Sequence, residues 1–248
     1  AALQKSLTRL SSGSRITQPA DDAGGLAVSM KLSGTINRLS GVEKNIDNAI
    51  SFLQVQDGVL DSAGKILDRM AELKALSQDV LKNDSDIANY NAEFKNLQVQ
   101  LYQMSETTFN GVSLFATTYE NAAGNDVKVS FNTSSSANTV NIFTSASGES
   151  GSIVSINKTA LLSALTIDAT KGNVSNSQAF QDAATINDQI RSFGSETTGG
   201  AFELGEVSVA VFTQALQNIA TLRAENGGSV SRLQFSKESA SQQKTNLE

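Results

Sequence analysis

The stretch LSGVEKNIDNAISFLQVQDGVLDSAGKILDRM, from Leu39 to Met70, decides the fold because its apolar side chains repeat every seven residues. The first row of the repeat contains Leu39, Ile46, Leu53, Leu60 and Leu67. The second apolar position of the same heptads holds Val42, Ala49, Ala63 and Met70. Gln56 interrupts the second row and Lys74 interrupts the first. So regular a repeat predicts one packed helix over residues 37–82, on the order of 60 Å long at about 1.5 Å per residue.

A second helix is predicted after the loop at residues 83–86. Large apolar side chains follow one another at intervals of three and four: Tyr90, Phe94, Leu97, Leu101 and Met104. The helix is expected to end near Ser105, and Asn110-Gly111 beyond it is a turn sequence. Because the two helices are joined by a short connection, an antiparallel helical hairpin is expected.

The last segment, residues 201–248, is predicted to be helical again, because it also carries a seven-residue pattern. It contains Phe212, Ile219, Leu233, Ala240 and Leu247, with Val209, Leu216 and Val230 on the neighbouring row. Gly227-Gly228 costs about 2 kcal/mol of helix propensity relative to alanine, so a break or kink is expected to be tolerated there.

Between these helices the composition shifts to Ser, Thr, Asn, Gly and Ala. Residues 127–131 and 139–143 are predicted to be strands that pair as a hairpin. Residues 158–165 and 178–193 look helical, and residues 192–200 form a loop. The predicted fold is therefore mainly α with a smaller α+β part. An elongated antiparallel rod would contain residues 1–118 and 201–248, and a variable, surface-exposed, β-containing domain residues 119–200.

Composition excludes several classes of function. The formal charge is −6 and no Lys/Arg cluster offers a phosphate-binding stripe, which argues against nucleic acid as a partner. No run approaches about 18 apolar residues, so membrane insertion is not predicted. The sequence opens inside a helical pattern, without an initiator Met or a basic-then-apolar leader. We therefore expect a segment of a longer protein that contains no conventional secretory signal.

Cysteine and histidine are both absent from the sequence, which removes disulfides, thiolate nucleophiles, Cys/His zinc sites and His-based triads. Three carboxylates cluster in sequence at Glu196, Glu203 and Glu206, on a loop and an early helical turn where acidic residues are common. We expect no enzymatic activity, no cofactor and no metal site.

The pair Asp21-Asp22 allows two interpretations. Two carboxylates could serve as a general acid/base pair or as half of a cation site. Alternatively, an Asp between Pro19 and Ala23 caps the following helix by accepting backbone N–H bonds. The cap is favoured because adjacent carboxylates at a helix start point in different directions and no third ligand is evident.

Several motifs resemble bacterial flagellins. LSSGSRI (Leu10–Ile16) and ADDAGGLAVS (Ala20–Ser29) resemble the family's N-terminal signature, and SETTFNGVSLF (Ser105–Phe115) is similar to the segment that closes its second helix. TLRAENGGSVSRLQF (Thr221–Phe235) resembles the C-terminal pattern more loosely. The resemblance implies a structural subunit of the flagellar filament that is used for motility and assembled with other flagellin subunits. It also implies a protein that is exported without a cleavable signal peptide and is located outside the cell. An export chaperone and a filament cap are further partners that the family implies.

Two surfaces follow from the resemblance. Arg15 could pair with Asp21, with Asp22 or with a carboxylate of a neighbouring subunit. LDRMAELKALS (Leu67–Ser77) is similar to a family helix used for subunit packing and read by an innate-immune Toll-like receptor in some members, and Arg69, Glu72 and Leu73 match its pattern. An ordinary exposed helix face is the alternative.

A binding protein is the alternative to a filament subunit. In that interpretation the chain is a cell-surface flagellin homologue, an adhesin whose Ser/Thr/Asn-rich middle domain recognises an extracellular ligand such as a polysaccharide. Polar hairpins suit the hydroxyl groups of a glycan, but they suit plain exposure to solvent equally well.

Overall fold

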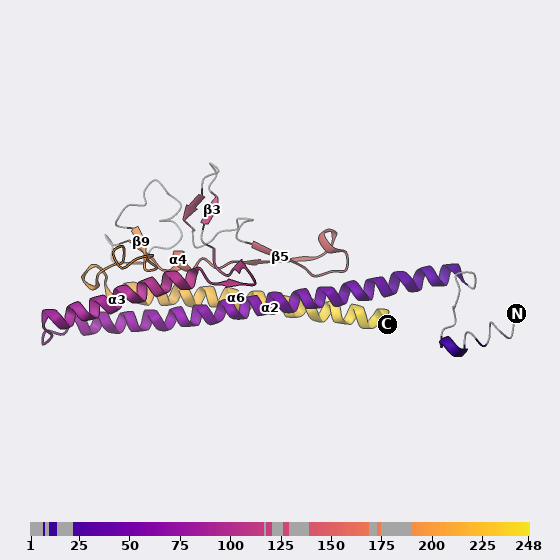
Figure 1. Cartoon of the computed structure of the whole chain (residues 1–248), viewed down its shortest axis with the longest axis horizontal. Coiled ribbons are helices and arrows are strands. Elements are labelled where there is room, and N and C mark those ends of the chain that lie inside the picture. Colours follow the sequence, from indigo (N-terminus) through magenta and orange to yellow (C-terminus); the bar gives the residue numbers. More distant parts are fainter. Residues whose placement is uncertain are drawn as a thin grey trace. The chain divides into compact units, whose positions relative to one another are not determined.

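The computed structural model describes residues 7, 10–13, 22–116, 118–120, 126–128, 139–168, 173–174 and 190–248 (Figure 1). Three long helices dominate: α2 (Ala23–Ser77), α3 (Asp84–Ser105) and α6 (Val209–Leu247). The shorter elements are β1 (Thr108–Phe109), β2 (Val112–Ser113), β3 (Thr118–Glu120), β4 (Asp126–Lys128), β5 (Thr139–Phe143), η2 (Gly148–Ser150), β6 (Ile153–Asn157), α4 (Leu161–Ala164), β7 (Thr166–Asp168), β8 (Asn173–Val174), β9 (Ile190–Ser192) and η4 (Leu204–Glu206). The prediction of a mainly α fold with a smaller α+β part is confirmed.

The chain divides into two compact units, each assembled from separate segments. Unit 1 contains Ala1–Asp47, Phe143–Ile153 and Gln234–Glu248, and unit 2 contains Asn48–Ile142 and Val154–Leu233. Both units therefore contain a portion of α2 and a portion of α6. The predicted division at residues 119 and 200 remains a prediction.

Both heptad rows of α2 are buried. The first row, from Leu39 to Leu67, is no more than 1% exposed, and the second row reaches 7% at Val42. The helix begins earlier than predicted, at Ala23, and ends earlier, at Ser77. At its C-terminal end the N–H groups of Gln78 and Asp79 donate to the carbonyls of Ala75 and Leu76. These i→i+3 bonds tighten and close the last turn.

In unit 2, α2 and α6 run antiparallel. Arg223 of α6 contacts Asp57 and Asp61 of α2, whereas Asn226, one turn further along α6, contacts the earlier residue Leu53. Unit 1 repeats this order, because Lys237 pairs with Asp47 and Lys244 with Glu43.

No break occurs at Gly227-Gly228, since α6 is continuous through both residues. Leu222 before the glycines and Leu233 after them are no more than 1% exposed. Burying each leucine contributes about 1.5–3 kcal/mol, which exceeds the roughly 1 kcal/mol that each glycine costs.

The prediction that residues 201–208 are helical is wrong, because only η4 forms there.

The predicted pairing of residues 127–131 with 139–143 is also wrong. β4 pairs antiparallel with β3, and β5 pairs with β6. The connection between β5 and β6 supplies the reason. Gly148 takes a positive φ of 60° there, and the N–H of Thr144 donates to the carbonyl of Ser152 at 2.9 Å.

The two short helices predicted in the middle segment are only partly present. Of residues 158–165, only Leu161–Ala164 are helical, as α4. Residues 190–192, predicted as the end of the second helix, form β9, which pairs antiparallel with β7. Residues 178–189 lie outside the described residues.

An aromatic cluster holds the core of unit 2 together. Phe94 of α3, Phe212 of α6 and the loop residues Phe193 and Phe202 are each no more than 1% exposed. Phe193 stacks on Phe212 with ring centroids 5.3 Å apart, and Phe94 meets Phe212 edge-on at 6.1 Å. Described residues of the middle segment therefore pack directly against the helices.

Candidate functional site

Asp22 lies immediately before α2. One of its carboxylate oxygens accepts a hydrogen bond from the N–H of Gly25 at 2.9 Å, and its carbonyl accepts from the N–H of Leu26 at 3.0 Å. This is the geometry of a helix N-cap. Arg15 and Asp21 lie outside the described residues.

The acidic cluster at residues 196–206 is occupied by structural contacts. Glu196 accepts from the hydroxyl of Tyr102 at 3.0 Å, and Glu203 accepts from Lys95 Nζ at 2.8 Å. Glu206 accepts from the N–H of Glu203 and completes a capping box around η4. The hydrogen bond and charge of Lys95 lower the pKa of Glu203, which is the opposite of what a general acid needs.

The residues that the structure describes contain no metal-binding arrangement. Among them, no group of three or more acidic side chains is placed to hold a metal ion. None of the described helices combines the length and apolar content needed to cross a membrane. The candidate sites among these residues are therefore surfaces of the helices.

The first surface lies on α2 and α3, around Arg69. Its guanidinium binds both carboxylate oxygens of Glu93, at 2.8 and 3.2 Å, and one oxygen of Glu72 at 2.7 Å. These bonds raise the pKa of Arg69, with Glu93 the largest cause. Leu73, by contrast, is fully buried, so it belongs to the core and not to the exposed face. Of the three residues predicted for this surface, only Arg69 and Glu72 can contact a partner.

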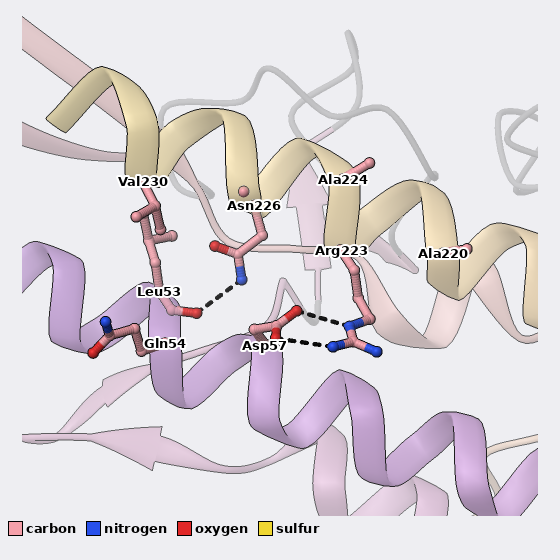
Figure 2. A pocket seen from close by; sticks show the side chains of 9 residues that line it. Leu53, Gln54, Asp57, Ala220, Arg223, Ala224, Asn226 and Val230 are labelled. Carbon is pink, nitrogen blue, oxygen red and sulfur yellow. Dashed lines mark hydrogen bonds and ion pairs between the residues drawn. The ribbon is translucent and has the colours of Figure 1, made fainter. Parts of the chain in front are cut away.

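The second surface is the groove between α2 and α6, which the sequence analysis did not predict. Arg223 donates to both oxygens of Asp57, at 2.8 and 3.1 Å (Figure 2). It also donates to Asp61 at 2.8 Å. The hydrogen bond that Arg223 donates to Asp57 is the largest cause of the raised pKa of Arg223. All three side chains are about 40% exposed, so solvent weakens these pairs and they orient the helices more than they stabilise them.

The groove beside this ion pair has a volume of about 620 Å³. Its lining residues come from both helices: Leu53, Gln54, Asp57, Ala220, Arg223, Ala224, Asn226, Gly227 and Val230. The side chains that α6 places there are mostly small. A Cβ atom added at Gly227 or Gly228 would meet nothing within 4 Å, so neither glycine is required by packing within the chain.

Asn226 forms the floor of the groove. It is 3% exposed, and its Nδ2 donates to the carbonyl of Leu53 at 2.8 Å (Figure 2). Its Oδ1 has no hydrogen-bond partner among the described residues. The residue falls on the seven-residue row of Phe212, Ile219 and Leu233, and its polarity at that position was the available sequence signal.

Comparisons with known proteins point to one family. Residues 1–120 match the model described as the bacterial flagellin N-terminal helical region. The chain is 37% identical over 118 residues to a flagellin of Halalkalibacterium halodurans, an alignment that covers 47% of this chain and 43% of the relative. It is 34% identical over 124 residues to the flagellar filament 31.3 kDa core protein of Treponema maltophilum, covering 50% and 43%. The chain therefore spans less than half the length of these relatives.

A solved structure supports the same fold. The crystal structure of Bacillus cereus flagellin superposes with a TM-score of 0.50 at 21% identity, covering 79% of this chain and 88% of that chain. Nothing in these comparisons supports the alternative of a binding protein or adhesin.

Proposed function

Because residues 1–120 of this chain belong to the bacterial flagellin family, we propose that the whole protein is a structural subunit of the flagellar filament. The subunit is exported, lies outside the cell and serves motility by self-assembly with other flagellin subunits. An export chaperone and a filament cap are the further partners that this role requires.

The observation that carries the proposal is the match of residues 1–120 to the flagellin N-terminal helical region. The described carboxylates support a structural role, because Glu196, Glu203 and Glu206 are engaged in contacts within the chain. We assign the protein no catalytic function.

Assembly would use the outer faces of the long helices. A repeating unit that presents different faces to different neighbours forms an open helix when the rotation between neighbours does not close into a ring. The groove around Asn226 is a suitable face, since it combines a buried acceptor that has no partner among the described residues with glycines that packing within the chain does not require. An unpaired buried acceptor costs about 1–3 kcal/mol, and two helical glycines cost roughly 2 kcal/mol. Close approach of a helix with a hydrogen-bond donor would offset both. The exposed pair Arg69–Glu72 provides a second candidate contact.

The proposal is tested by labelling the protein in its own cells. The gene is deleted and then returned with Ser150→Cys, which places a thiol at an exposed position of a sequence that contains no cysteine. A thiol-reactive dye that does not enter cells should stain filaments along their whole length, with no staining in cells that carry the unsubstituted gene. Export of the variant with unstained filaments would contradict the proposal.

A further inference from the structure

Asparagine followed by glycine occurs twice in the chain, at Asn110-Gly111 and at Asn226-Gly227. Glycine leaves the preceding side-chain amide open to attack by the next backbone nitrogen, because it has no Cβ atom to block the approach. The two dipeptides share this local chemistry but lie in opposite environments. They therefore provide a comparison within one molecule.

Asn110-Gly111 forms the two-residue loop of the β1–β2 hairpin. Phe109 and Val112 are directly paired, and both loop residues have positive φ, 50° at Asn110 and 79° at Gly111. This is the pattern of a type I′ turn. Both residues are exposed, and a Cβ atom added at Gly111 would meet nothing within 4 Å. Space around the attacking nitrogen and the side-chain amide is therefore open to water.

We propose that Asn110 is a site of spontaneous deamidation. The backbone nitrogen of Gly111 gives up its proton to hydroxide and attacks Cγ of Asn110. A new N–Cγ bond forms, the Cγ–Nδ2 bond breaks, and ammonia leaves with a proton from water, which closes a five-membered succinimide ring. One water molecule then opens either C–N bond of the ring. The products are aspartate and isoaspartate, and the net change is the loss of one ammonia, the uptake of one water and the gain of one negative charge.

Asn226-Gly227 is protected by its surroundings. It lies within the continuous helix α6, where the N–H of residue 227 donates to the carbonyl four residues earlier. The Asn226 side chain is 3% exposed and its Nδ2 is held by the carbonyl of Leu53 at 2.8 Å. Ring closure there requires local opening of the helix. Its rate is therefore limited by the small fraction of molecules in which the helix is open at this position.

The two products at Asn110 have different structural effects. Aspartate preserves the backbone and adds a charge at the turn. In isoaspartate the main chain passes through Cβ and Cγ of residue 110, so the two-residue loop becomes one backbone atom longer. The pairing of Phe109 with Val112 cannot accommodate this longer loop. Phe109 packs edge-on against Phe52 of α2 at 6.1 Å, so isoaspartate disturbs the contact between the hairpin and the helix.

The test compares both sites in the same sample. The chain is incubated in its folded state at several mildly alkaline pH values, digested, and analysed by peptide mass spectrometry. We expect the amide at Asn110 to be lost at least about 100-fold faster than the amide at Asn226, because α6 must open before Asn226 reacts. The rate at Asn110 should rise with pH, since the attacking nitrogen must lose its proton.

Two controls separate structure from sequence. In urea both dipeptides should react at similar rates, because the fold no longer distinguishes them. Asn110→Gly retains a residue that accepts positive φ and should abolish the mass gain of this peptide while Asn226 is unchanged. Equal rates at the two sites in the folded chain would overturn the proposal. So would an Asn110 that keeps its amide when folded but loses it in urea.

Discussion

At the scale of single residues, two polar side chains interrupt the heptad rows of α2 and yet are buried. Gln56 is fully buried and donates from Nε2 to the carbonyl of Leu114. Lys74, 9% exposed, donates from Nζ to the carbonyl of Leu204 at 2.6 Å. Each interruption therefore attaches α2 to a segment outside the three long helices, because Leu114 follows β2 and Leu204 begins η4. The heptad pattern identifies such positions, but their partners lie 58 and 130 residues away and cannot be read from it.

Gln56→Leu tests the first of these contacts. The substitution leaves the buried carbonyl of Leu114 without this donor, so we expect the free energy of unfolding to fall by about 1–3 kcal/mol. Urea denaturation measures the change. Gln54→Leu, at an exposed position two residues earlier, should stay within about 0.5 kcal/mol of the unsubstituted chain. Equal effects of the two substitutions would contradict the assignment.

The stability of the chain should depend on alkaline pH through Lys74. Burial lowers the pKa of this ammonium below its usual 10.5. Between the folded and unfolded pKa values the unfolded chain binds more protons, so the free energy of unfolding rises with pH across that window. The contribution of Lys74 to the free energy of unfolding is fully present above pH 10.5, and it is lost as the pH falls through the pKa of Lys74 in the folded chain. Urea midpoints of the natural chain and of Lys74→Met are compared over this range. The difference between them should rise with pH, because Lys82 and Tyr102, whose pKa values are also shifted, contribute to both chains alike.

At the scale of elements, the existence of each long helix could be predicted from periodicity, but its ends could not. Heptads report which face is buried, whereas a helix starts where a side chain can accept the free N–H groups of the first turn. Asp22 does this for α2. Asn83 does it for α3, because its Oδ1 accepts from the N–H of Asp86 at 2.9 Å. The predicted loop at residues 83–86 is therefore already the first turn of α3.

Asn83→Ala should lower the free energy of unfolding by about 1 kcal/mol, because the first turn of α3 loses its acceptor. Asn83→Asp keeps an acceptor oxygen and adds a negative charge at the positive end of the helix, so it should retain stability. Urea denaturation of the three chains measures the difference. A loss of stability in the Asp variant as large as in the Ala variant would argue against the cap.

Substituting the glycines of α6 should increase the stability of the chain, in contrast to the substitutions of Asn83. Gly227→Ala and Gly228→Ala should each raise the free energy of unfolding by about 1 kcal/mol, because the helix gains propensity and the new Cβ atom meets nothing within 4 Å. Gly194→Ala is the contrasting variant, since its Cβ atom would lie 2.5 Å from Cδ2 of Leu162. It should destabilise the chain, as thermal unfolding of all three variants would reveal.

The strands were the weakest part of the prediction. Strand propensity located residues 139–143 correctly, and β5 has those bounds. Propensity does not choose a partner, and the choice was wrong because Gly148 and the hydrogen bonds of Thr144 fold the chain onto β6. Strand β9 could not be foreseen either, since its pairing with β7 joins residues more than 20 positions apart, a separation that no local pattern records.

At the scale of the whole molecule, Phe193 connects the middle segment to the helical core. It contacts three other aromatic rings, from α3, α6 and the loop before α6. Phe193→Ala should cost about 3–5 kcal/mol, a large part of the stability of a typical domain. Circular dichroism in urea should show the helical signal lost at a much lower denaturant concentration. Phe235→Ala, at a residue 73% exposed, should leave the midpoint nearly unchanged.

The function was more accessible from sequence than the contact surfaces were. Short motifs such as LSSGSRI and ADDAGGLAVS carry the family resemblance because they are contiguous in the chain. The groove around Asn226 is assembled from residues more than 160 positions apart, and Leu73 is hidden by packing that a helical pattern does not specify. Surfaces of this kind appear only once the chain is folded.

The separation between α2 and α6 has a consequence for the order in which the protein folds. The bonds from Arg223 to Asp57 and from Asn226 to Leu53 span 166 and 173 residues. Closing a loop of that length costs about 4–5 kcal/mol by (3/2)RT ln n, and it cannot happen until the ribosome has released the C-terminal segment. A nascent chain therefore lacks α6, one of the two helices of this seam, until residues 209–247 have been synthesised. Folding is delayed by topology itself, and such a delay would suit the export proposed above.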